Sequence, residues 1–144
     1  MASHIVTALA LSLVLTGARA ADAATLTVTA TGLTPQQGQI FVSLFDGEKQ
    51  YLEKSLMRLN EPVGESGSLD VSFEGLAPGD YAVSVFYDED NDGELDTGLF
   101  RIPKERVGFS NNARGKFGPA KWKHTKFRVD QDTHITIRLV DAVD

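Results

Sequence analysis

The residues best suited to chemistry in this sequence form an acidic run from Asp88 to Asp96, which reads Asp-Glu-Asp-Asn-Asp-Gly-Glu-Leu-Asp. Three aspartates at alternate positions followed by a glycine are typical of the first half of calcium loops. There several carboxylates converge on one ion and the glycine permits a sharp bend. We therefore expect a structural Ca²⁺ site in this run. Its expected ligands are Asp88, Asp90, Asp92, Glu94 and Asp96.

The run differs from an EF-hand in two respects. Counted from Asp88, the twelfth position is Leu99, where an EF-hand has a bidentate glutamate. The preceding residues also have the pattern of a strand and not of a helix. The alternative is an acidic turn in water, with Asp and Asn present because they favour turn geometry.

A second unusual segment, Gly98–Trp122, is rich in aromatic, glycine and basic residues. One interpretation is that its aromatic side chains plug the loop onto the end of the domain while Asn side chains tie its backbone. The other is a recognition surface for a protein or a cell-surface polymer, that is, a peptide or a sugar. Its basic residues would meet an acidic partner or the acidic remainder of the domain. The candidate partner-binding residues are Phe109, Asn111, Asn112, Arg114, Phe117 and Trp122.

Most of the chain after residue 23 alternates apolar and polar residues with a period of two, which predicts strands. The clearest examples are Thr25–Thr31, Gln39–Phe45 and Tyr81–Tyr87. Asp46–Lys54 is expected to form a short helical turn that carries Tyr51 and Leu52 inward.

At the C-terminal end, Thr125–Val129 and Thr133–Leu139 look like a closing hairpin. An odd loop of three residues between them would place the apolar residues of both strands on one face.

Short strands separated by turn signals, with no long helical period, favour an all-β fold. We expect a single Greek-key-type β-sandwich of about seven strands. One long ordered loop, Thr97–Lys123, is expected to interrupt it. Loops of that length in compact domains are usually functional or specifically held.

The N-terminus predicts export. The run Ile5–Leu15 is mostly apolar and too short to span a bilayer as a helix, which needs about 20 residues. Ala18-Arg19-Ala20 has the small-x-small form of a signal-peptidase site. We expect a signal peptide over residues 1–20, a domain over 21–144, and a periplasmic or secreted location without an integral membrane segment after cleavage. Cleavage after Ala23 is an alternative, as is a membrane anchor or buried helix.

The composition excludes some kinds of site and makes nucleic acid an unfavourable partner. The chain has no cysteine, which excludes disulfides, thiol catalysis and zinc–thiolate sites. Its formal net charge of −6 makes nucleic acid an unfavourable partner, because phosphate backbones would be repelled.

Five motifs in order resemble a known family. They are Gly75-Leu76-x-Pro-Gly-x-Tyr81-Ala82, the acidic run, Ile102-Pro103-Lys104-Glu105, Gly108-Phe109-Ser110-Asn111-Asn112 and Phe117-Gly118-Pro119. Together they resemble DUF2141, a family of exported bacterial proteins of unknown function, over roughly residues 25–140. The resemblance implies a secreted or periplasmic β-sandwich without an established activity. The first motif alone is similar to transthyretin-like and carboxypeptidase-regulatory-like domains.

Three functions remain open at this point. The first is an exported binding or accessory module stiffened by calcium. The second is a structural domain of envelope assembly that makes contact through a sheet edge. The third, a glycan or peptide hydrolase, has little support, because Ser110 lacks a Gly-x-Ser-x-Gly setting and no histidine is placed beside it. We therefore expect no enzymatic activity.

Overall fold

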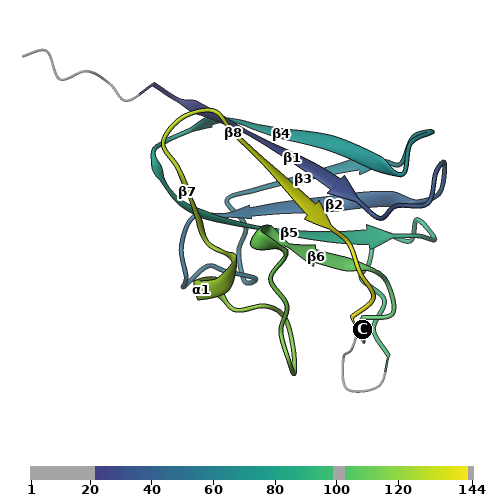
Figure 1. The fold of residues 1–144 in the computed structure, drawn as a ribbon. Helices are drawn as coiled ribbons and strands as arrows, with labels where there is room; N and C mark the ends of the chain where they lie inside the picture. The colour runs from purple at the N-terminus through teal and green to yellow at the C-terminus, as the bar shows by residue number, and fades with distance from the viewer. Residues whose placement is uncertain (1–21, 99–102, 143–144) are drawn as a thin grey trace, which may run out of the picture.

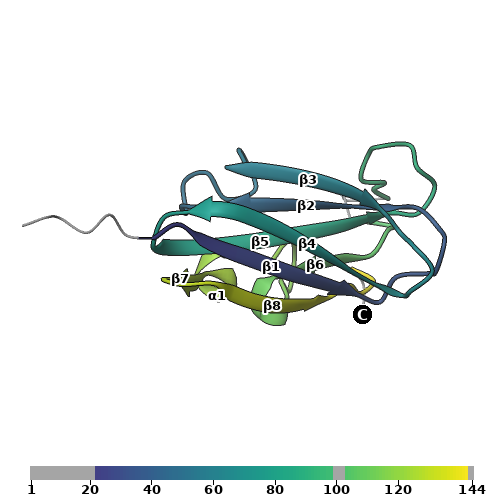
Figure 2. The same cartoon turned by 90° about the horizontal axis from the view of Figure 1, so that it is seen from above.

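The computed structural model describes residues 22–98 and 103–142, so the predicted signal peptide lies outside the described residues. The chain is an all-β sandwich of two sheets, as predicted (Figures 1 and 2). Its strands are β1 (Ala24–Thr31), β2 (Gln39–Phe45), β3 (Met57–Pro62), β4 (Ser68–Leu76), β5 (Gly79–Asp88), β6 (Val107–Phe109), β7 (Phe127–Val129) and β8 (Thr133–Arg138). Two short helical turns, η2 (Ser110–Asn112) and α1 (Trp122–Thr125), lie between β6 and β7.

The smaller sheet has the strand order β4-β1-β8, and the larger has the order β3-β2-β5-β6, with β7 also paired to β5. β1 pairs antiparallel with β4 and parallel with β8, so the first and last strands lie side by side. Figure 1 shows the smaller sheet above the larger one, and Figure 2 looks down on them, so that their strands overlap. Among the residues that the structure describes, no helix is long and apolar enough to cross a membrane.

The core lies between the sheets and follows the period-two pattern of the sequence. In β1, Leu26, Val28 and Ala30 are fully buried, while the threonines between them are only partly buried. In β5, every second side chain from Tyr81 to Tyr87 faces the same core. The alternation therefore identified the buried face of these strands correctly.

The predicted closing hairpin is wrong. β7 pairs antiparallel with β5 in the larger sheet, whereas β8 pairs parallel with β1 in the smaller one. The apolar residues of both segments still face the core, as the parity argument required. The period-two pattern determines which face of a strand is buried. It does not determine which strand is the neighbour, and here β7 and β8 pair in different sheets.

Two further expectations need correction. The segment Thr97–Lys123 is not one long loop, because it contains β6, η2 and the start of α1. The turn over Asp46–Lys54 does not carry Leu52 inward: this side chain is 40% exposed and its backbone has a φ of 62°. Tyr51 alone points back onto the domain, where its hydroxyl donates a hydrogen bond to the Ala120 carbonyl at 2.8 Å.

Candidate metal centre and neighbouring loop

Asp88, the last residue of β5, is fully buried, and its carboxylate accepts hydrogen bonds from three donors. Gln39 Nε2 in β2 lies 2.7 Å from Oδ2, Gly93 N lies 3.0 Å from Oδ2, and Asp92 N lies 3.2 Å from Oδ1. Burial alone would raise the pKa of this carboxyl, but the hydrogen bonds outweigh burial and lower the pKa below its usual value. The charged carboxylate therefore holds the start of the following loop.

Two further carboxylates cap N–H groups within the same bend. Asp90 Oδ1 accepts from Asp92 N at 3.3 Å, and Asp92 Oδ1 accepts from Glu94 N at 2.8 Å. Asn91 and Gly93 have positive φ angles of 62° and 81°, a conformation that these two residue types adopt more readily than others. The alternation of Asp and Asn thus has a role in the turn that requires no metal.

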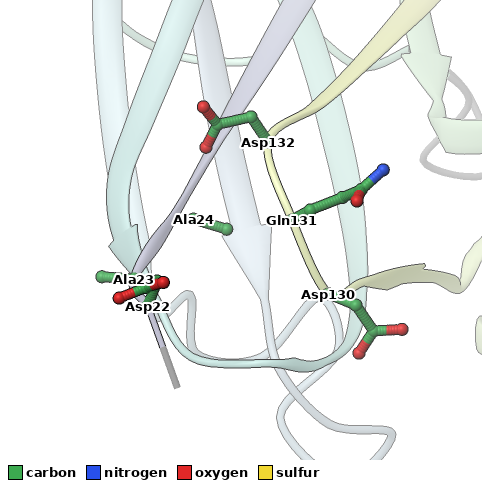
Figure 3. A pocket seen from close by; sticks show the side chains of 6 residues that line it. All are labelled: Asp22, Ala23, Ala24, Asp130, Gln131 and Asp132. Carbon is green, nitrogen blue, oxygen red and sulfur yellow. The ribbon is translucent and has the colours of Figure 1, made fainter. Parts of the chain in front are cut away.

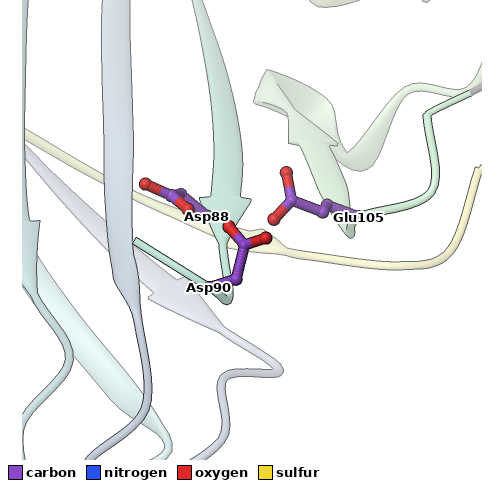
Figure 4. A group of neighbouring side chains, drawn as sticks. All are labelled: Asp88, Asp90 and Glu105. Carbon is purple, nitrogen blue, oxygen red and sulfur yellow. The ribbon is translucent and has the colours of Figure 1, made fainter. Parts of the chain in front are cut away.

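A carboxylate from a later segment, Glu105, completes the cluster, although it is not among the five ligands expected from the acidic run. Glu105 is 8% exposed and accepts backbone hydrogen bonds from Glu89 at 2.9 Å and from Asp96 at 3.2 Å. One ligand oxygen from each of Asp88, Asp90 and Glu105 lies within 4.8 Å of the others (Figure 4). The acidic run is therefore closed by a side chain from the segment that leads into β6.

A second group is formed by Asp90, Asp92 and Asp96, whose ligand oxygens also lie within 4.8 Å of one another and whose side chains are exposed. Glu94 is exposed and belongs to neither group. Within the described residues, the structure thus brings four of the five predicted ligands into two groups that share Asp90.

Arg106 fastens this loop to the body of the sandwich. Its guanidinium forms an ion pair with Glu89 at 2.7 Å and donates to Thr34 Oγ1 at 3.0 Å and to the Gly32 carbonyl. The same group lies 4.9 Å from the centroid of the Tyr87 ring. An arginine with partners on three sides fixes the segment that positions Glu105.

We expect the Glu105 carboxyl to titrate above its usual range. Burial raises its pKa, and the negative charges of Asp88 and Asp90 raise it further, against two hydrogen bonds that lower it. The folded state then binds a proton more readily than the unfolded chain. The contribution of Glu105 to stability is therefore present below the pKa of the unfolded chain and is lost as pH rises through the folded pKa. Carbon NMR of the Glu105 carboxyl in a buffer with chelator measures the midpoint.

The substitution Glu105→Gln provides the control for this titration. It keeps the shape and removes the ionisation, so this component of the pH dependence of unfolding should disappear. The same change at the exposed Glu65 should leave it in place. A midpoint for Glu105 at or below the usual value for glutamate would contradict the expectation.

Beyond β6, the residues Ser110–Asn112 form what we call the latch. The Ser110 side chain is fully buried, and its hydroxyl donates to the Thr125 carbonyl at 2.6 Å while it accepts from Val83 N at 3.0 Å. One hydroxyl thus joins β5 to the C-terminal end of α1.

The two asparagines extend the latch to the chain around α1 and to the smaller sheet. Asn111 Nδ2 donates to the carbonyls of His124 and Lys126, both at 3.0 Å. Asn112 Oδ1 accepts from Arg138 N in β8 at 2.8 Å. Their φ angles of 61° and 47° are those that Asn tolerates. Both side chains therefore tie backbone segments together.

The aromatic residues of this segment have different environments. Trp122 lies edge to face with Tyr51 at a centroid distance of 5.8 Å, and Tyr51 contacts Phe45 in the same manner at 5.3 Å. Trp122 thus packs as a plug. Phe117, in contrast, has a relative exposure of 104% and plugs nothing. Arg114 is exposed and makes an interaction within the chain.

The outer face of the larger sheet has an aromatic row that the sequence analysis missed. Phe41 and Phe86 stack at 4.6 Å, and the Arg58 guanidinium lies 4.6 Å from the centroid of the Phe41 ring. Phe109 is half-buried on the same face, opposite Ser84 of β5. The available signal was that Phe41 and Phe86 occupy outward positions of their period-two strands.

An open depression at the other end of the sandwich contains none of the predicted site residues (Figure 3). It is lined by Asp22, Ala23, Ala24, Asp130, Gln131 and Asp132. The carboxylate of Asp132 accepts a hydrogen bond from Thr25 N at 2.8 Å, which joins β1 to the start of β8. The depression therefore reflects the contact between two strand ends.

Comparisons with known proteins identify a matching family and one similar solved structure. The sequence model of the family described as "Uncharacterized protein conserved in bacteria (DUF2141)" matches residues 28–137. Among solved structures, a fimbrial assembly protein from Parabacteroides distasonis is 14% identical, with a TM-score of 0.43 over 83% of this chain. The chain spans about half of that protein, 52% of its length. No curated protein matches.

Proposed function

We propose that this chain, which belongs to the DUF2141 family of bacterial proteins, is an exported, non-catalytic accessory or binding domain whose acidic loop holds a calcium ion. The position of the Glu105 carboxylate supports the cation most directly. This residue is nearly buried and comes from a different segment, yet its carboxylate lies within 4.8 Å of those of Asp88 and Asp90. Three negative groups at this distance repel one another, and a divalent cation between them would remove the repulsion.

The donor set suits calcium. All five residues of the two groups are carboxylates, the hard oxygen ligands that Ca²⁺ and Mg²⁺ prefer over softer nitrogen or sulfur. A carboxylate oxygen that accepts one N–H keeps a lone pair for a cation, so the hydrogen bonds of Asp88 and Glu105 do not use up these ligands. The flexible geometry of Ca²⁺ tolerates an irregular cage better than the octahedron of Mg²⁺ does.

A thermal melt tests the cation. Extracellular modules bind Ca²⁺ with dissociation constants of about 0.1–1 mM, so a few millimolar Ca²⁺ should raise the melting temperature by roughly 3–6 °C over a sample in chelator. Mg²⁺ at the same concentration should have little effect. The rise should vanish in Glu105→Gln and persist in Glu65→Gln. An equal melting temperature in chelator and in Ca²⁺ would reject the cation.

We propose that the domain is non-catalytic because the side chains best suited to catalysis already form hydrogen bonds within the protein. The Ser110 hydroxyl is buried and bonded on two sides, and His134 Nε2 lies 2.7 Å from Thr29 Oγ1 on the outside of the smaller sheet. Export is proposed from the N-terminal sequence.

A further inference from the structure

The segment that leads from η2 into the start of α1 projects from the sandwich (Figure 1). We call residues 113–123 the cationic finger. Phe117, near its tip, has a relative exposure of 104%, and the aromatic pairs among the described residues do not include it. A single exposed apolar side chain is common on protein surfaces, so Phe117 becomes informative only together with the charges and the exposed apolar side chain that surround it.

The exposure of Phe117 follows from how the finger is built. At its base, the Tyr51 hydroxyl holds the Ala120 carbonyl at 2.8 Å, and Trp122 packs on the Tyr51 ring. Within it, a Cβ on Gly115 would lie 1.8 Å from the Gly118 carbonyl oxygen, so the two arms of the finger approach closely. The structure therefore holds the ring away from the core.

The finger is also locally basic, although the protein as a whole is acidic. Residues 113–123 contain four Lys or Arg and no Asp or Glu, whereas the whole chain has a formal net charge of −6. Lys116, Lys121 and Lys123 are exposed, and the ion pairs among the described residues do not include them. The charges of these three lysines are thus available to an external anionic surface.

We propose that the cationic finger docks this domain on a bilayer surface with anionic headgroups, with Phe117 in the interfacial layer and the three lysines at the phosphates. Basic residues gain free energy near such a surface, and apolar side chains such as Phe and Leu gain free energy where they enter the boundary between headgroups and acyl chains. A protein partner would need a continuous complementary patch around its anchor. A fluid bilayer accepts side chains from separate loops, and the neighbouring turn held by Tyr51 offers the exposed Leu52.

A dye at position 117 provides the test. Because the chain has no cysteine, Phe117→Cys in the full chain can be labelled specifically with a polarity-sensitive fluorophore. Vesicles that contain phosphatidylglycerol should shift its emission to the blue, and high salt or pure phosphatidylcholine should abolish the shift. The matched control is a dye at the exposed Ser66, between β3 and β4, whose emission should not move. The local readout separates the finger from any membrane binding by the apolar run Ile5–Leu15.

Variants without the lysine charges measure how much these charges contribute to the affinity of the finger for anionic vesicles. Replacing Lys116, Lys121 and Lys123 together by Gln should weaken finger docking roughly 100-fold, at about fivefold per lysine, without a change in melting temperature. An unchanged affinity in this variant, or a dye at 117 that stays solvated on anionic vesicles, overturns the proposal. A blue shift with polyglutamate but not with vesicles also overturns it and assigns the finger to an acidic protein partner. Chelator should not alter docking, because the acidic loop lies at the other end of β6.

Discussion

Replacing Asp88 by Ala is expected to lower the free energy of unfolding by about 3 kcal/mol, measured by urea denaturation in chelator. The buried carboxylate accepts charge-assisted hydrogen bonds from Gln39, Asp92 and Gly93, each worth roughly 1.5–3 kcal/mol in isolation. The sum is smaller than three such bonds, since water reaches the exposed loop donors after the substitution. The lowered pKa of Asp88 indicates that these bonds outweigh the cost of burying its charge.

The pH dependence gives a second readout of the same residue. Because the folded pKa of Asp88 is below that of the unfolded chain, its contribution is present above the unfolded value and is lost as pH falls through the folded one. Asp88→Asn should remove this loss while it keeps part of the stability. The control Glu65→Ala, at an exposed position, should stay within about 0.5 kcal/mol of the parent. A similarly small effect of Asp88→Ala would mean that the loop folds without it.

Asp88 therefore has two separable roles. In chelator it organises the loop through hydrogen bonds, and with calcium it would also bind the ion. Glu105 differs, because its burial raises its pKa and makes its charge unfavourable without a counter-ion. Substitution of Asp88 should lower stability in either buffer, whereas Glu105→Gln should remove the response to calcium together with the pH dependence that comes from Glu105. The pair thus distinguishes a turn that is merely acidic from a cation site.

The sequence was sufficient to predict the two-sheet architecture because burial imposes a period of two on each strand. Leu26, Val28 and Ala30 show this, as does the alternation from Tyr81 to Tyr87. The partner of a strand is not encoded in that period. Phe127 and Val129 of β7 face the core as expected, yet they do so in a different sheet from β8.

The candidate site was predictable only where its residues are adjacent in the chain. The Asp-x-Asp-x-Asp-Gly spacing identified the bend, because a local turn has a local pattern. Glu105 reaches the cluster only because the chain returns past the end of β5 after residue 103. Its signals in the sequence were its place in the motif Ile102-Pro103-Lys104-Glu105 and its negative charge inside an otherwise basic segment. The outward position of Leu52 depends on a positive φ that the apolar pattern does not reveal.

The contacts of the latch could not be predicted from the sequence either. From the sequence alone, Ser110–Asn112 can be either a structural tie or part of a recognition surface. Its side chains contact β5, α1 and β8, which come from distant parts of the sequence. Two asparagines with positive φ are favourable here because each side chain satisfies backbone groups that would otherwise lack partners.

Replacing Ser110 by Ala is expected to cost about 2 kcal/mol of unfolding free energy, since it removes the acceptor of Val83 N and the donor to the Thr125 carbonyl. Both Ser110 and Val83 are fully buried, so water cannot replace the lost hydroxyl. Hydrogen exchange reports this directly: the Val83 amide should exchange roughly 30-fold faster in the variant, the factor that corresponds to this free energy.

The matched control is Ser84→Ala, one residue further along β5, where the side chain is half-buried. The hydrogen bonds among the described residues do not include its hydroxyl, so this change should stay within about 0.5 kcal/mol of the parent. If the two variants were equally stable, Ser110 would be dispensable for folding, and its burial between β5 and α1 would require a functional explanation. If Ser110→Ala alone is destabilised, the Ser110 hydroxyl is a structural tie between β5 and α1.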